Sequence, residues 1–485
     1  MAGPATLTVQ PGVIVRFDQS AGLSVDGKLR AVGTASQPIT FTGTTQEPSW
    51  WDGISINGPS TGPNNIGSVL SYVTLEYGGG YADLYLEYAA VTVTNSIIRN
   101  SSHDGINGWY GGVADISNTA FSGNQGYAVQ FTDGSVNPGL GGLTASGNIT
   151  NAVALGPGTL KGAHTWEYTG IPYILTAEES VEVSSTLTIQ PGVEMQFQES
   201  SGLTVNGRLN ASGTASQPIT FTASTRQPGW WDGVNVIGTA EEPTAGVILN
   251  YATIEYGGGY ANVYVEYGVA SISHSIIRNS STDGVYAWYG GAGSTIEVSQ
   301  IVNNAGHGVS NVEPTKTLFA SNNWRGSNSG PALVGNSACN PSGTGSTVTT
   351  GVAFSPFLGS AGADPGPLAA GASAILALAP ERWFVPADGV IRAWVDITLR
   401  NGSGQPLPGR TVLLNSTRGA VVDGGVTDIQ GQTRAYVTSD TPGDAVLTAS
   451  LDYETACESA SSPSARITFT PASDTPDLLP EEAAP

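Results

Sequence analysis

The chain has 485 residues, of which 65 are glycine, 39% are hydrophobic and only 12% are charged. This length allows two or more domains, and the composition excludes a highly charged disordered chain. The 39 acidic residues outnumber the 17 basic ones and give a formal net charge of −22. That charge excludes nucleic acid and anionic membrane surfaces as partners and leaves neutral glycans, cations and basic surfaces.

The first forty residues contain short apolar runs separated by glycine, such as Val13–Phe17, Leu23–Val25 and Ile39–Phe41. Each run has three to five residues, which is too short for a helix and typical of a strand. Together with the many Gly, Thr, Ser, Val and Ile residues, these runs predict an all-β protein with many turns.

A long segment of the sequence occurs twice. WWDG at Trp50–Gly53 returns at Trp230–Gly233 with an offset of 180 residues. EYGGGY at Glu76–Tyr81 returns at Glu255–Tyr260 with an offset of 179, so one residue was lost between the two motifs. We therefore divide this part of the chain into a first copy, residues 1–164, and a second copy, residues 165–358.

A shorter period lies inside each copy. Asn95 and Asn118 are 23 residues apart, and Gly284 and Gly308 are 24 residues apart, with matching surroundings. A period in the low twenties made of short strands predicts a β-solenoid. About sixteen turns stacked at about 4.8 Å would fill residues 1–358 and make a rod of about 75–80 Å.

The segment LTVQPGVIVRFDQSAGLSVDGKLRAVGTASQPITFT at Leu7–Thr42 resembles the opening of secreted right-handed parallel β-helix proteins of bacteria. NNWRGSNSGP at Asn322–Pro331 and GVAFSPFL at Gly351–Leu358 resemble the way such helices end. The resemblance implies a right-handed parallel β-helix over residues 1–358. It implies little about activity, because the family includes lyases, glycosidases, adhesins and structural proteins.

The pattern changes after a Gly/Ala/Pro linker at residues 359–373. Longer alternating strands separated by turn residues predict a β-sandwich over residues 374–471. The stretch from DGVIRAWVDITLRN to GDAVLTAS resembles the bacterial Ig-like domain of invasin-type adhesins. The acidic, proline-rich tail at residues 472–485 is expected to be mobile.

The chain shows no run of about twenty apolar residues, so we expect no membrane insertion. The second copy of LTIQPG follows a long lead-in, Thr165–Thr186, that the first copy lacks. We therefore expect a trimmed or mature form whose export signal is not in this chain, and an extracellular or cell-surface location.

The strand ADLYLEY at Ala82–Tyr88 is the most informative for function. Leu84 and Leu86 alternate with Asp83, Tyr85 and Glu87, so one set should enter the core while the other faces water. In the second copy valines replace the two leucines, whereas the tyrosine and glutamate are unchanged. The two copies thus predict two equivalent outward strips of aromatic and acidic side chains.

Flat rings and carboxylates are what sugar recognition needs, since C–H faces stack on rings and hydroxyls donate to carboxylates. The alternative is that these aromatics cover a neighbouring turn and merely record a recent duplication. The candidate ligand-binding residues are Glu76, Tyr85, Glu87 and Trp109 in the first copy and Glu255, Tyr264, Glu266 and Trp288 in the second. The pairs Trp50–Trp51 and Trp230–Trp231 are better explained as loop anchors.

We identify no catalytic residues. GHG at Gly306–Gly308 matches one motif of polygalacturonases, but the paired-aspartate and Arg-Ile-Lys motifs that should accompany it are absent. His307 is therefore better explained as a surface residue on a turn, and the sequence leans against an enzyme without deciding the question.

The four histidines have no zinc-like spacing, and no other metal-ligand set appears, so we assign no metal or cofactor. Asp-Gly pairs such as Asp26-Gly27 and Asp283-Gly284 could hold a structural Ca²⁺, although Asp-Gly is first a turn signal. The only two cysteines, Cys339 and Cys457, could form a disulfide across 118 residues in an exported protein, or remain free thiols.

The sequence predicts a non-catalytic extracellular or cell-surface protein with a structural or adhesive role. Its expected partners are a glycan or extracellular polymer, or copies of itself in a fibre, since exposed terminal turns of a solenoid can stack. The alternative is a polysaccharide lyase or glycoside hydrolase of the parallel β-helix type.

Overall fold

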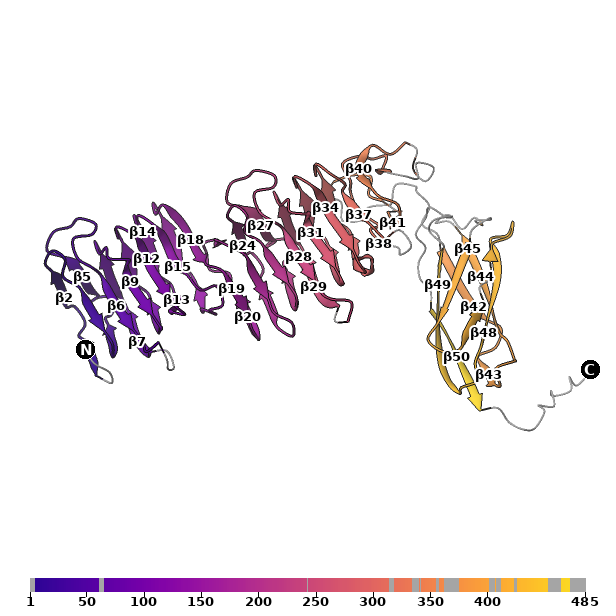
Figure 1. The fold of residues 1–485 in the computed structure, drawn as a ribbon, viewed down its shortest axis with the longest axis horizontal. Coiled ribbons are helices and arrows are strands. Elements are labelled where there is room, and N and C mark those ends of the chain that lie inside the picture. The colour runs from indigo at the N-terminus through magenta and orange to yellow at the C-terminus, as the bar shows by residue number, and fades with distance from the viewer. Residues whose placement is uncertain are drawn as a thin grey trace, which may run out of the picture.

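The computed structural model describes residues 5–60, 65–241, 243–313, 318–333, 340, 342–354, 357–361, 375–400, 406, 411–422, 425–451 and 464–471. These residues form a parallel β-solenoid of about 13 turns followed by a β-sandwich (Figure 1), which confirms the all-β prediction. The only helix among them is the short 3-10 helix η1 (Gly291–Gly293). Most of the predicted linker, the predicted tail and both cysteines lie outside the described residues.

Three parallel sheets form the faces of the first half of the solenoid. One contains β1 (Thr6–Val9), β4 (Lys28–Val32), β7 (Asn65–Ser71), β10 (Ala89–Thr94), β13 (Val113–Ser117) and β16 (Leu140–Gly141). Another contains β2 (Ile14–Phe17), β5 (Ile39–Gly43), β8 (Val73–Glu76), β11 (Ile97–Arg99), β14 (Ala120–Ser122) and β17 (Thr144–Ser146).

The third face is the only sheet among the described residues that runs through both halves, and we call it the shared sheet. Its twelve strands are β3 (Leu23–Val25), β6 (Ile54–Asn57), β9 (Ala82–Glu87), β12 (Asp104–Trp109), β15 (Tyr127–Phe131), β18 (Thr150–Leu155), β21 (Tyr173–Leu175), β24 (Glu194–Phe197), β27 (Ile219–Ala223), β30 (Ala252–Glu255), β33 (Ile276–Arg278) and β36 (Gln300–Val302).

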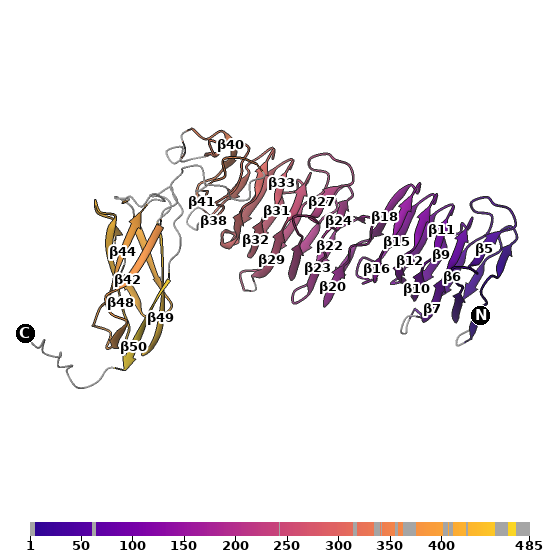
Figure 2. The same ribbon diagram turned by 180° about the vertical axis from the view of Figure 1, so that it is seen from behind.

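Two further sheets complete the second half. One contains β19 (Gly158–Leu160), β22 (Glu179–Val181), β25 (Leu203–Val205), β28 (Val234–Ile237), β31 (Ala261–Glu266), β34 (Asp283–Trp288), β37 (Val309–Asn311), β40 (Gly345–Val348) and β39 (Pro331–Leu333). The other contains β20 (Ala163–Trp166), β23 (Thr186–Ile189), β26 (Arg208–Ser212), β29 (Thr244–Asn250), β32 (Gly268–Ser273), β35 (Thr295–Glu297), β38 (Leu318–Phe319) and β41 (Val352–Ala353). Figure 2 shows the same stacked strands from behind.

The core is built from inner side chains that stack in register from turn to turn. In the shared sheet Ile54 pairs with Leu84, Leu84 with Ile106, and Ile106 with Val129, and all four are fully buried. Each strand presents a β-branched or leucine side chain inward and a polar one outward, which is the period-2 pattern of a half-buried strand.

Polar ladders at the corners hold the turns together. The backbone N–H of Ser101 donates to the Asn124 side-chain oxygen at 3.0 Å, and the N–H of Asn124 donates to Asn148 at the same distance. The Asn148 amide in turn donates to the carbonyl of Phe121 at 3.1 Å. These buried amides satisfy backbone groups that a corner would otherwise leave unpaired.

The solenoid has fewer turns than the sixteen that the sequence predicts. Compact turns keep the expected spacing, as in the pairing of Ile97 with Ala120, but Arg30 pairs with Val69 because surface loops lengthen that turn to 39 residues. About 13 turns at about 4.8 Å give a rod of about 60 Å rather than 75–80 Å.

The two copies do not occupy the same sheets. Equivalent strands differ by 22 in chain order, for example β9 and β31, and 22 strands equal seven turns of three strands plus one strand. Strand β9 therefore belongs to the shared sheet, whereas β31 belongs to the neighbouring sheet of the second half.

The sandwich packs two sheets around a core of its own. One sheet has the order β42 (Ile375–Pro380), β44 (Ala393–Arg400), β48 (Gln432–Thr438) and β46 (Ala420–Val422). The other has the order β43 (Phe384–Ala387), β50 (Ser464–Pro471), β49 (Gly443–Leu451), β45 (Thr411–Ser416) and β47 (Gly425–Val426). Buried residues such as Val395, Ile397 and Phe469 fill the space between them.

Candidate functional site: an aromatic groove on the first copy

Strand β9 has the orientation that its alternating sequence predicts. Leu84 and Leu86 are fully buried in the core, while Tyr85 and Glu87 are partly exposed on the outer side. The equivalent Val263 of β31 is also fully buried in the core. Tyr85 and Glu87 thus face away from the core as predicted, but the same prediction is wrong for Asp83, which is fully buried.

A groove of about 500 Å³ lies over the outer face of the shared sheet in the first copy. It is lined by Tyr81, Tyr85, His103, Asp104, Asn107, Trp109, Gln125, Gly126 and Gln130. This volume is within the range of natural small-ligand sites. The strands β9, β12 and β15 position most of these side chains, since their outer residues lie side by side in register.

Exposed aromatic rings form the rim of this groove. The ring of Tyr81 is 69% exposed and lies 5.0 Å from that of Tyr85, measured between centroids. Trp109 is 40% exposed and lies beside Glu87 on the neighbouring strand. Such rings leave flat apolar faces available for a ligand.

The bottom of the groove is polar and fixed by hydrogen bonds. The Asn107 side-chain amide donates to Asp104 Oδ2 at 2.8 Å and to Gln130 Oε1 at 3.0 Å. The backbone N–H of Tyr127 donates to Asp104 Oδ1 at 2.7 Å. Asp104 is thus held by two donors in a position that the register of β12 and β15 determines.

Burial shifts the titration of two groups that line the groove. Desolvation, and next the negative charge of Glu87, raise the pKa of Tyr85 to about 12. Burial also raises the pKa of Asp104, although its bonds with Asn107 and Tyr127 oppose the shift. Tyr85 therefore stays neutral at physiological pH and can donate its hydroxyl hydrogen.

The equivalent surface of the second copy is built differently, which corrects the expectation of two equivalent strips. Tyr286 stands where the first copy has Asn107, and its ring lies 5.7 Å from that of Tyr264. Tyr264 is only 3% exposed, and its hydroxyl donates to Glu266 at 2.7 Å. Trp288 stacks on Tyr289 at 4.6 Å. These aromatic side chains contact one another, as the alternative explanation of the sequence expected.

Two of the predicted acidic residues are not part of any exposed strip. Glu76 is 5% exposed and binds Arg99 at 2.7 Å, and Glu255 is 4% exposed and binds Arg278 at 2.7 Å. The prediction that these glutamates present an open acidic surface is wrong. Each is covered and neutralised by an arginine that the 23-residue register brings opposite it.

The paired tryptophans are loop anchors, as predicted. Trp51 is fully buried, stacks on Phe17 at 4.2 Å and donates its indole hydrogen to the Glu76 carbonyl at 2.9 Å. Trp231 repeats this arrangement with Phe197 at 3.9 Å. This anchoring is therefore the same in the two copies.

The two copies differ at a buried residue beneath the turn that follows Glu76 in the first copy and Glu255 in the second. Asp83 is fully buried and accepts the Gly78 N–H through Oδ1 at 2.7 Å, whereas its Oδ2 has no hydrogen-bond partner among the described residues. The second copy has Asn262 there, and its Nδ2 donates to the Arg278 carbonyl at 2.9 Å. Burial raises the pKa of Asp83 well above its ordinary range.

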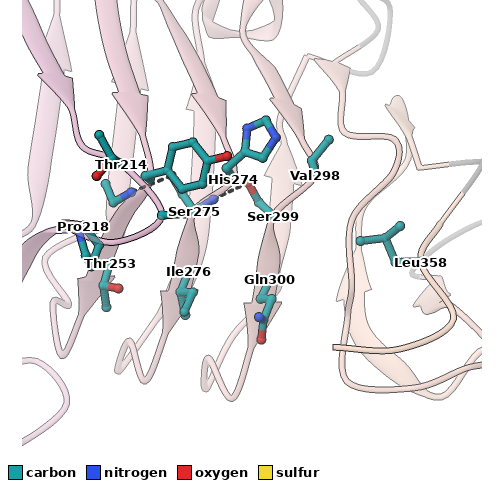
Figure 3. Close-up of a pocket in the computed structure, with 13 residues that line it drawn as sticks. Thr214, Pro218, Thr253, His274, Ser275, Ile276, Val298, Ser299, Gln300 and Leu358 are labelled. Carbon is teal, nitrogen blue, oxygen red and sulfur yellow. Dashed lines mark hydrogen bonds between the residues drawn. The ribbon is translucent and has the colours of Figure 1, made fainter. Parts of the chain in front are cut away.

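A second hollow of about 520 Å³ lies along a corner of the second copy (Figure 3). Thr253, Ile276 and Gln300 follow one another on successive strands at its edge. The serines that line it already bond the scaffold, since the N–H of Ser275 donates to Ser299 Oγ at 3.1 Å. We find nothing in this hollow that indicates a ligand.

The remaining sequence candidates have structural partners. His307 is half-buried, with Nδ1 2.8 Å from Thr347 Oγ1, and its backbone N–H donates to Asp283 at 2.6 Å. Asp26 accepts a bond from Asn57 at 3.2 Å. No group of three or more potential metal ligands occurs among the described residues. A structural Ca²⁺ stays a prediction.

Sequence reasoning missed most of the groove. Tyr81, Asp104, Asn107 and Gln130 were not selected, because they come from separate turns that only the three-dimensional register brings together. A signal was present in the repeat itself, since Asn107 lies in a three-residue stretch, Ile106–Gly108, that differs from Val285–Ala287 of the second copy, although both copies share the Asp-Gly before it and the Trp after it.

Comparisons with family models confirm both predicted resemblances. A model described as a pectate-lyase like β-helix domain matches residues 158–310, and one described as a bacterial Ig-like domain (group 1) matches residues 376–470. A search of curated proteins gave no match. Among the described residues no helix is long and apolar enough to cross a membrane.

Several solved structures resemble a fifth of the chain. The D0-D1 domain of intimin is 19% identical over 19% of this chain, with a TM-score of 0.17, and invasin, described as a bacterial integrin-binding protein, is 28% identical over 21%, with a TM-score of 0.17. The adhesin InvE of Yersinia pseudotuberculosis is 22% identical over 21%, with a TM-score of 0.18.

These matches cover 46%, 20% and 26% of the three solved chains, respectively. With such low TM-scores they establish nothing about what this chain binds. What the family models show is a chain that joins a segment similar to pectate-lyase-like β-helices to a segment similar to bacterial Ig-like domains.

Proposed function

We propose that this protein is a non-catalytic adhesive or structural protein of the cell surface or extracellular space, and that the groove of its first copy binds a glycan. One observation carries the glycan proposal: exposed rings of Tyr81 and Trp109 flank a fixed polar surface made by Asp104, Asn107 and Gln130.

The chemistry of the groove suits a sugar ring. Its apolar C–H face can stack on the exposed indole of Trp109 or the phenol of Tyr81, while hydroxyls at the ring edge exchange hydrogen bonds with amides and carboxylates. The strands β9, β12 and β15 belong to a continuous sheet, so the site is preorganised and a ligand need not order it.

The surface location rests on the modular organisation of the chain. A solenoid is a stiff spacer, and the sandwich matches the model of a bacterial Ig-like domain (group 1). A rod that displays a glycan site and carries an Ig-like module is suited to attachment. Assembly into fibres through the ends of the solenoid stays a prediction that light scattering can test.

A glycan array with matched tryptophan variants tests the proposal. Trp109→Ala should lower binding at least about tenfold, because loss of a stacking ring costs about 1.4 kcal/mol or more. Trp288→Ala removes the same residue from the second copy, where it stacks on Tyr289, and should leave binding unchanged.

Equal losses in both variants would show that the aromatic residues act through stability and not through ligand contact. A folded wild-type chain that binds no glycan on the array would overturn the glycan proposal and leave a purely structural role.

The competing proposal is a polysaccharide lyase or glycoside hydrolase, which the description of the matched β-helix model favours. That match begins at residue 158, after the groove residues. Release of reducing sugar, or absorbance from unsaturated uronates, would support an enzyme. Any such activity that survives Trp109→Ala would place it elsewhere in the chain.

A further inference from the structure

We infer that the groove of the first copy selects neutral, hydroxyl-rich glycans and rejects uronate-containing and sulfated ones. This inference rests on the proposed function, and it concerns the class of glycan and not whether one is bound. It separates this groove from the uronate chemistry that the pectate-lyase-like description suggests.

The charges around the groove are the first reason. None of the described residues that line it is a lysine or an arginine, and Asp104 contributes a carboxylate to its surface. Glu87 lies beside Trp109 in the paired strands, and its charge is felt by Tyr85. An anionic sugar would meet like charges here, with no lysine or arginine among the described lining residues to compensate them.

Arg99, a partly exposed cation of the first copy, is already engaged in an ion pair. Arg99 bonds Glu76 through two of its nitrogens, at 2.8 Å and 2.7 Å, on β11 and β8 of a different sheet. The chain as a whole carries a net charge of −22, which adds a long-range repulsion of polyanions.

The hydrogen bonds that the groove residues already make with one another are the second reason. Both hydrogens of the Asn107 amide are used, one by Asp104 and one by Gln130, so this side chain cannot donate to a ligand. The Asp104 carboxylate is held in place by Asn107 and by the Tyr127 N–H, so it cannot turn away from an incoming anion. Fixed acceptors of this kind are complementary to sugar hydroxyls, which donate.

The second copy suggests a substitution that would close the groove of the first copy. Tyr286 occupies the position of Asn107 there and packs against Tyr264 and Tyr260, at 5.7 Å and 6.3 Å. Asn107→Tyr places the tyrosine of the second copy in the first copy, where its neighbour in register is Gln130 instead of Ser310.

Calorimetric titration of the full chain tests the inference. Three hexasaccharides are compared at pH 8, where histidine side chains are largely neutral: cellohexaose and maltohexaose as neutral probes, and hexagalacturonate as the anionic probe. A neutral probe should bind at least tenfold more tightly than hexagalacturonate, and Asn107→Tyr should abolish that binding while circular dichroism shows that the variant is folded.

Asp104→Asn provides a second variant that retains an oxygen for the Tyr127 N–H. It should raise the affinity for hexagalacturonate relative to wild type by several-fold, most clearly at low salt. Circular dichroism confirms that the variant is folded.

The outcomes separate the two levels of the proposal. Tighter binding of hexagalacturonate than of either neutral probe, lost in Asn107→Tyr, would overturn the inference about ligand class and leave the glycan proposal standing. No binding of these probes or of any array glycan would overturn both. Binding that persists in Asn107→Tyr would show that the ligand lies outside this groove.

Discussion

The two copies of the solenoid share their scaffold and differ in their surface. Both bury apolar side chains at equivalent inner positions, anchor the same loop through Trp51 or Trp231, and pair a covered glutamate with an arginine. They differ at Asn107 and Tyr286, which leave a groove in one copy and an aromatic cluster in the other. The comparison teaches that duplication preserved the stacking contacts while several outer positions changed, since His103, Asn107 and Gln130 of the groove correspond to Thr282, Tyr286 and Ser310 in the second copy.

The largest effect is expected from removing the shared anchor. Trp51→Ala and Trp231→Ala should each destabilise the solenoid by about 3–5 kcal/mol, since each empties a fully buried site next to a stacked phenylalanine. Denaturant unfolding followed by circular dichroism measures both. A loss in only one copy would break the claim that the scaffolds are equivalent.

The second largest effect is expected on glycan affinity, from substitutions at the equivalent positions Asn107 and Tyr286. Asn107→Tyr should weaken glycan binding by about a hundredfold or more, because the ring would fill the groove. Tyr286→Asn should expose Tyr264 without rebuilding the polar bottom of the groove, because Ser310 stands there in place of Gln130 and already bonds Asp283, so calorimetry should still record a stoichiometry near one. If Tyr264 stays protected from modification by a tyrosine reagent in this variant, Tyr286 is not what covers it.

A pH-dependent difference follows from Asp83. Because burial raises its pKa, the folded chain holds a proton that the unfolded chain, with a pKa of about 3.9, releases. The contribution of Asp83 to the free energy of unfolding should therefore fall as pH rises above about 4. Asp83→Asn should stabilise the chain at pH 8, by an amount on the order of 1 kcal/mol or more, and give no advantage near pH 3.

Asn262→Asp is the matched control and should introduce the same penalty into the second copy. Unfolding free energies measured from pH 3 to pH 8 compare the two variants. An Asp83→Asn variant that is less stable than wild type at pH 8 would show that the carboxylate is charged and compensated in the native state.

The smallest effect is expected beneath the glutamate–arginine pairs. Thr222 Oγ1 donates to Glu255 at 3.0 Å, whereas the buried hydroxyl of Thr42 has no partner among the described residues. Thr222→Val should cost about 1 kcal/mol, and Thr42→Val should be neutral or slightly stabilising. Thermal unfolding measures the two variants, and equal costs would contradict the difference between the copies.

The fold could be predicted from the sequence because every turn of a solenoid repeats the same short strands with the same inward-facing positions. Alternation in Ala82–Tyr88 predicts which side chains enter the core, and the 23-residue spacing of Asn95 and Asn118 predicts the turn. The number of turns was overestimated because the length of surface loops has no periodic signal. The change of sheet between copies follows from an extra strand that no motif marks.

The site could be predicted from the sequence only in part. Tyr85 and Trp109 were found from a strip on single strands, but the burial of Glu76 depends on Arg99, which the register brings from another turn. Alternation gives the side of the sheet on which a residue lies and cannot give what covers it. The difference between Asn107 and Tyr286 could have been found by comparing the copies position by position.

The central claim is that one groove per chain, in the first copy, binds a glycan. The most direct measurement is a calorimetric titration of the wild-type chain and Asn107→Tyr with the neutral hexasaccharide that binds. The account predicts one site per wild-type chain and none in the variant. Two equivalent sites in the wild type, or one site that Asn107→Tyr leaves intact, would contradict it.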